Sequence, residues 1–139
     1  MSKLHSVEVH LEATPTQPSL SLIIMNAFRL GCTFSVDIAK NPVLTPEEVV
    51  KKLLLDFQNP DPLYLSYARG VEIVYEGSIL TLFAYSNQNR LQLTFLASQY
   101  VWYRSYKSSE YVNLEKYIKF ILQLCNPLPL KKLETLMDD

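Results

Sequence analysis

The sequence contains two histidines, a residue type that can bind metal ions or act as a general base. His5 and His10 are five positions apart, so their side chains project from opposite faces of an extended strand. A zinc site needs three or four nitrogen, sulfur or carboxylate ligands brought together, and the sequence shows no such spacing. We therefore interpret both histidines as ordinary strand residues, and we expect no metal and no cofactor.

The two cysteines, Cys32 and Cys125, are far apart in the chain and form no CxxC motif. A cysteine nucleophile requires a thiolate and usually a neighbouring base. Cys32 lies among alternating apolar residues, and Cys125 lies on the apolar stripe of the last long helical segment. The sequence predicts two buried, unreactive thiols in a reducing compartment, with a disulfide as the alternative.

Common catalytic motifs are missing from the sequence, which has no GxSxG, P-loop or GxGxxG pattern. Gly31, Gly70 and Gly77 stand alone and are typical of turns. The neighbouring carboxylates Glu47 and Glu48 are explained by helix capping. We expect no enzyme; the alternative is an enzyme whose site the fold assembles from scattered polar residues.

Aromatic and cationic side chains gather between residues 100 and 119, a segment called here the basic aromatic region. Such side chains can stack on nucleic-acid bases while contacting phosphates. They also concentrate in protein interfaces. The third interpretation is simple packing, in which the long cations extend outward from buried stems. The candidate partner-binding residues in this region are Tyr100, Trp102, Arg104, Tyr106 and Lys107.

The C-terminal segment, residues 128–139, carries apolar residues at helical spacing. We therefore predict a short amphipathic helix in this tail. The helix either docks onto its own domain or presents an apolar ridge to another chain, and a frayed terminus is the remaining alternative. Its candidate partner-binding residues are Leu130, Leu133, Leu136 and Met137.

Three strands are predicted ahead of the first helix. Residues 5–12 alternate between apolar and polar, which indicates a half-buried strand. Residues 14–18 contain two prolines and predict a loop. Residues 19–28 are predicted as a strand that is apolar on both faces, and residues 32–38 alternate again.

The first predicted helix begins after Thr45. Pro46 suits the first helical position, and Glu48 completes a capping box with Thr45. An apolar stripe at helical spacing follows, made of Val50, Leu53, Leu54 and Phe57.

The rest of the chain predicts a strand meander followed by a second helix. The predicted strands cover residues 63–69, 71–76, 78–85, 91–95 and 99–106, and their short connections favour antiparallel pairing. The second helix covers residues 110–124, and Asn126-Pro127 ends it. Its predicted buried stripe consists of Leu114, Tyr117, Ile118, Ile121 and Cys125.

The predicted fold class is α+β, with a mainly antiparallel sheet of about six to seven strands and helices on one face. Two main helices and the short C-terminal amphipathic helix complete it. The 139 residues predict a single domain over residues 1–127, followed by the tail at 128–139. No stretch reaches the length of a membrane-spanning helix, and residues 1–14 lack the apolar block of a signal peptide. We therefore expect an intracellular, cytoplasmic protein.

The expected function is that of a non-enzymatic protein-interaction or assembly module, adaptor-like or chaperone-like. It would form a homodimer or a higher oligomer, or bind another protein. The absent catalytic motifs, the 12% aromatic content and the leucine-bearing tail favour this interpretation. The alternative is a small viral-type structural protein that oligomerises and contacts anionic membrane or RNA. The formal net charge of −1 weighs against general nucleic-acid binding, which usually requires a basic excess.

Overall fold

The computed structural model describes residues 3–35, 43–58, 70–76, 78–97 and 110–138. Within these ranges it has an open antiparallel sheet of six strands and three helices, so the predicted α+β class is confirmed. The strands are β1 (Lys3–Leu11), β2 (Thr33–Ser35), β3 (Val71–Tyr75), β4 (Ser78–Asn87), β5 (Arg90–Ala97) and β6 (Leu130–Asp138). The helices are α1 (Gln17–Arg29), α2 (Pro46–Gln58) and α5 (Glu110–Cys125).

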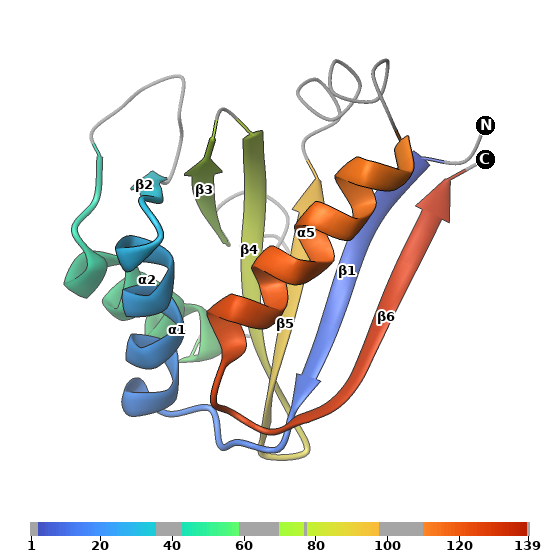
Figure 1. The fold of residues 1–139 in the computed structure, drawn as a ribbon. Coiled ribbons are helices and arrows are strands. Elements are labelled where there is room, and N and C mark those ends of the chain that lie inside the picture. The colour runs from blue at the N-terminus through green and yellow to red at the C-terminus, as the bar shows by residue number, and fades with distance from the viewer. Residues whose placement is uncertain (1–2, 36–42, 59–69, 77, 98–109, 139) are drawn as a thin grey trace.

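The strands lie side by side in the order β2-β3-β4-β5-β1-β6. All three helices cover one face, with α5 running diagonally across the central strands (Figure 1). On β1 the buried residues Val7, Val9 and Leu11 alternate with more polar neighbours. The first and last strands, β1 and β6, pair as neighbours. The two ends of the chain consequently lie close together at one corner of the sheet (Figure 1).

The β4–β5 hairpin closes with a two-residue turn. Asn87 pairs with Arg90, and both intervening residues have positive φ, 52° for Gln88 and 60° for Asn89. This is the geometry of the type I′ turn, whose twist matches that of the flanking strands. This turn sets the register of the two central strands.

The capping box at the start of α2 is confirmed. The backbone N–H of Glu48 donates to Thr45 Oγ1 at 3.2 Å, and the backbone N–H of Thr45 donates to Glu48 Oε1 at 3.0 Å. These hydrogen bonds lower the pKa of Glu48, the bond to the Thr45 backbone most strongly. Two otherwise unsatisfied backbone donors are thereby satisfied, which fixes where the helix begins.

The predicted strand over residues 19–28 is wrong, because this segment forms α1. The buried residues Leu20, Ile23, Ile24 and Ala27 follow the i, i+3, i+4, i+7 spacing of a helix. Pro18 occupies the first turn, where its missing N–H costs nothing. Apolar residues at both odd and even positions suggested a strand covered on both faces. They belong instead to the wide buried stripe of a helix that packs against both α2 and α5.

The predicted amphipathic helix at the C-terminus is also wrong, because this segment forms β6. It pairs antiparallel with β1 along nearly its whole length, from Lys3 opposite Asp138 to Leu11 opposite Leu130. An i, i+3 spacing of leucines fits a helix locally, but the outer backbone of β1 requires a strand partner. The tail is consequently the sixth strand of the sheet.

Four of the other predicted elements have counterparts in the structure. The strands predicted at 71–76, 78–85 and 91–95 and the helix at 110–124 correspond to β3, β4, β5 and α5. Of the predicted strand 32–38 the structure describes residues 32–35, in which Thr33–Ser35 forms β2. The predicted strands 63–69 and 99–106 lie outside the described residues. In the described ranges no helix is long and apolar enough to cross a membrane.

Asn26 links α1 to the end of α5. Its side-chain amide donates to the carbonyl of Leu124 at 2.9 Å and to that of Asn126 at 2.8 Å. These carbonyls lie at a helix C-terminus, where acceptors lack intrahelical partners. The amide therefore fixes the point at which the chain leaves α5 and turns toward β6.

Candidate functional site

Strand β6 is the long edge of the sheet. It pairs with β1 on one side, and within the described residues no strand lies on its other side. The opposite edge, β2, has three residues, and Leu44 partly covers it by donating its N–H to the Phe34 carbonyl at 2.8 Å. An uncovered edge presents a row of backbone donors and acceptors to any strand that approaches. We therefore take β6 as the candidate site.

The predicted apolar residues of the tail have different environments on β6. Leu130 is 43% exposed and Leu136 is 55% exposed, whereas Leu133 is half-buried and packs against the core. The side chain of Met137 lies outside the described part of the structure. Among the described residues, the edge thus combines backbone that has no strand partner on its outer side with two exposed leucines, although it is a strand and not the predicted helical ridge.

A hollow of about 490 Å³ lies on the sheet face opposite the helices, and Leu136 forms part of its wall. Phe83 and Tyr85 contribute aromatic surface from β4, with their ring centroids 6.5 Å apart. The exposed leucine of the edge is therefore continuous with apolar surface on the sheet face. The lining residues are Ser6, Glu8, Phe83, Tyr85, Ser86, Asn87, Gln92, Thr94, Leu96 and Leu136.

Four charged or titratable side chains form a cluster between β1 and β6. Glu8 lies directly opposite Glu134, and His10 lies opposite Lys132. Lys132 pairs with Glu134, which lowers the pKa of Glu134 and raises that of Lys132. His10 Nε2 lies 3.8 Å from Glu8 Oε2. Because two glutamates face each other across the strands, the cluster favours nearby positive charge.

Three members of this cluster could hold a metal ion. One ligand atom from each of Glu8, His10 and Glu134 lies within 4.8 Å of the others. His10 Nε2 is buried and has no hydrogen-bond partner in the described part of the molecule. Binding would require Lys132 to release Glu134, and all three side chains remain partly exposed. The two facing glutamates therefore favour positively charged groups, and Lys132 is one such group already paired with Glu134.

Sequence reasoning did not find this cluster. The i, i+2 spacing of Glu8 and His10 on one strand face was a usable signal, because alternate strand residues share a face. The contribution of Glu134 was hidden, since its segment was expected to be helical. Only the pairing of β1 with β6 brings that carboxylate to the other two.

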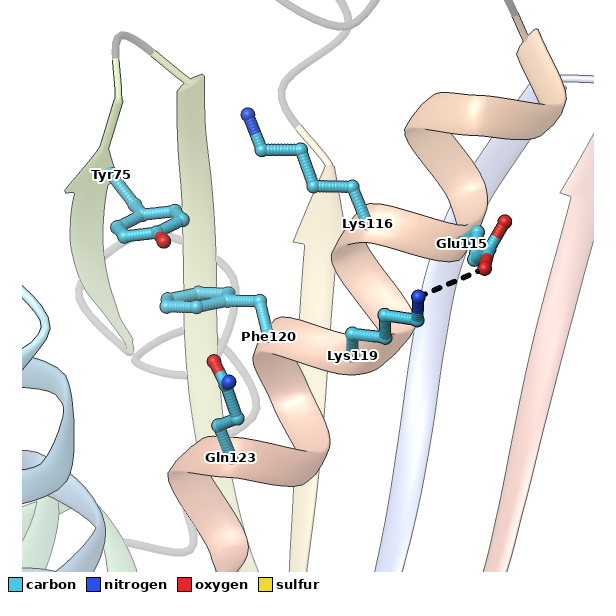
Figure 2. Close-up of a pocket in the computed structure, with 6 residues that line it drawn as sticks. All are labelled: Tyr75, Glu115, Lys116, Lys119, Phe120 and Gln123. Atoms are coloured by element: carbon cyan, nitrogen blue, oxygen red, sulfur yellow. Dashed lines mark ion pairs between the residues drawn. The ribbon is translucent and has the colours of Figure 1, made fainter.

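A second hollow, of about 370 Å³, lies between β3 and α5 (Figure 2). Tyr75 stacks on Phe120 with ring centroids 4.3 Å apart, and Lys119 pairs with Glu115 at 3.0 Å. Lys116 extends toward β3 and pairs with Glu76 at 2.6 Å. Both lysines thus have carboxylate partners. The lining residues are Tyr75, Glu115, Lys116, Lys119, Phe120 and Gln123.

The other predicted site residues fall outside the described residues. These are Tyr100, Trp102, Arg104, Tyr106 and Lys107, from the basic aromatic region. Within the described part of that region, Tyr117 is buried and takes part in the core. The interpretation of the remaining residues stays a prediction.

Both cysteines are buried and form no disulfide with each other, so the predicted burial is confirmed. Burial raises the pKa of the Cys32 thiol to about 11 and that of Cys125 to about 12. Desolvation disfavours the thiolate, which is the reactive form. The thiols therefore pack as small apolar groups.

No protein-family model matches the chain, and neither a curated protein nor a solved structure is similar to it.

Proposed function

We propose that this protein is a non-enzymatic interaction module, which binds another strand along the outer edge of β6. The observation that carries the proposal is a nine-residue edge strand paired on one side only within the described chain. Main-chain hydrogen bonds would supply affinity, and the exposed side chains would supply specificity. The exposed leucines Leu130 and Leu136 support this function because burial removes apolar surface from water.

The partner strand belongs to a protein, either a second copy of this chain or another one. Lys131 and Lys132 lie near the start of β6, and positive charge on an edge is a common defence against unspecific pairing. Such an edge selects strands that complement its charges and rejects others. An adaptor or an assembly module needs this kind of selectivity.

The experiment is affinity capture from the native source with three baits: the wild-type chain, Leu136→Lys and Leu122→Lys. Leu122 is a matched control because it is an exposed leucine, 41% accessible, on helix α5. We expect Leu136→Lys to lose the proteins that the other two baits retain. Equal capture by all three baits would contradict a role for the β6 edge.

A further inference from the structure

We propose that the strand accepted by β6 is β6 of a second copy, paired antiparallel about a two-fold axis through Leu133. This inference rests on the proposed function, because it names the partner of the same edge. An isologous pairing of this kind uses one surface twice and gives a closed dimer. The two sheets would join into one continuous sheet through their long edges.

The sequence of β6 complements itself in this register. Lys132 of one copy lies opposite Glu134 of the other, twice in the dimer, and Leu133 lies opposite its symmetry mate. Leu136 shares the sheet face of these charged pairs, whereas Leu130 lies opposite the buried Leu11 on the other face, beyond a β-bulge, so the apolar pair of this register is Leu133 with its symmetry mate. Opposite charges and apolar pairs directly across an antiparallel ladder are the combinations that stabilise it.

Neighbouring registers lose these pairs. If the axis moved to Glu134, that carboxylate would face its own symmetry mate, and like charges in opposition destabilise a ladder. If it moved to Thr135, Glu134 would face Leu136, which leaves a carboxylate against an apolar side chain. The axis at Leu133 is therefore the register in which Lys132 and Glu134 pair with each other.

The charge cluster inside each copy supports the same arrangement. Glu8 faces Glu134 from β1, and one lysine, Lys132, pairs with Glu134. Lys132 of the second copy would approach Glu134 from the outer side. In the group formed by Lys132 and Glu134 of both copies, each glutamate would then have a lysine as neighbour within its own strand and across the interface. Pairing between β1 and β6 is regular from Lys132 to Leu136, so the β-bulge between Lys132 and Leu130 lies outside the charged pairs.

The area of such a contact is small, because it involves the single strand segment 130–136 of each copy. Interfaces below the usual size are transient, so we expect dimers at high protein concentration and monomers on dilution. The association should also weaken with added salt, because the charge pairs are exposed to solvent.

The test is sedimentation equilibrium of wild type, Lys132→Glu and Glu134→Lys, and of the two variants mixed in equal amounts, up to about millimolar concentration. Each single change places like charges opposite each other twice, so each variant alone should dimerise at least about tenfold more weakly. In the mixture every introduced glutamate faces an introduced lysine, and dimerisation should return. Both positions are exposed, at 57% and 47%, and circular dichroism checks that the variants fold.

The outcomes separate this inference from the proposed function. A wild-type chain that stays monomeric overturns self-pairing, and the capture experiment then decides whether β6 binds a different protein. Single variants that dimerise as tightly as wild type overturn the register. A mixture that associates no better than its components overturns the charge pairing. The double variant Lys132→Glu/Glu134→Lys restores the complementarity within one chain and should dimerise like wild type.

Discussion

At the scale of single residues, the positions defined by local chemistry were predictable from the sequence. Thr45 and Glu48 cap a helix through contacts three residues apart, which any chain with this spacing can make. Burial of Cys125 followed from its place on an apolar helical stripe. The proximity of His10 to Glu134 was not predictable, because a contact between distant strands leaves no local pattern.

Leu53 and Leu55 on α2 form a matched pair for a stability prediction. Leu53 is fully buried and Leu55 is 50% exposed, although the residue type and the helix are the same. Leu53→Ala should lower the free energy of unfolding by about 2–5 kcal/mol, because it leaves a cavity in the core. Leu55→Ala should cost about 0.5 kcal/mol or less. Urea titrations of both variants measure the difference, and similar losses would contradict the burial of this face.

The pKa values of the thiols predict their reactivity as a function of pH. With the pKa of Cys125 at about 12 and that of Cys32 at about 11, both remain protonated in the folded protein at pH 8. The raised pKa favours folding below the unfolded value of about 9, and this contribution is lost as the pH rises toward 11–12.

Alkylation with iodoacetamide at pH 8 should therefore be slow for the native protein and fast in urea. Rapid modification of the native chain would show that a thiol is accessible or activated. Mass spectrometry of the modified peptides assigns the reaction to each cysteine.

At the scale of elements, the sequence predicted those whose apolar period was unambiguous. Strand β4 is a short, strongly apolar run, strand β5 alternates between apolar and polar residues, and α2 carries both a cap and an apolar stripe. In α1 nearly every residue from Leu20 to Ala27 is apolar, so the periods of helix and strand could not be told apart. In β6 the leucine spacing favoured a helix, and tertiary pairing with β1 overrode it.

Because β6 is a sheet strand, removing it should damage the whole domain. A chain ending at Pro129 would leave the backbone of β1 without its outer strand partner. It would also lack Leu133, so the part of the core that this side chain covers would be exposed to water. We expect a large loss of stability and a broadened thermal transition by circular dichroism. A truncated chain that unfolds as cooperatively as the full chain would contradict the assignment of β6 as an integral strand.

At the scale of the whole molecule, the helices cover one face of the sheet, and the long edge strand β6 remains at its border. Helices α1, α2 and α5 close one face of the sheet over the apolar core (Figure 1). The last strand, β6, forms the edge of the sheet and carries two exposed leucines and the ion pair of Lys132 with Glu134. We propose that the partner strand pairs with the outer edge of β6.

Hydrogen exchange of the β6 amides tests this claim most directly. The exchange of each amide between residues 130 and 138 is compared in dilute and in concentrated protein, with α2 as an internal reference. We expect the outward-pointing amides of β6 to become protected as the protein concentration rises, whereas those of α2 should not change. If the β6 amides exchange equally at every concentration in a sample that nevertheless associates, the contact lies elsewhere and β6 is not the binding edge.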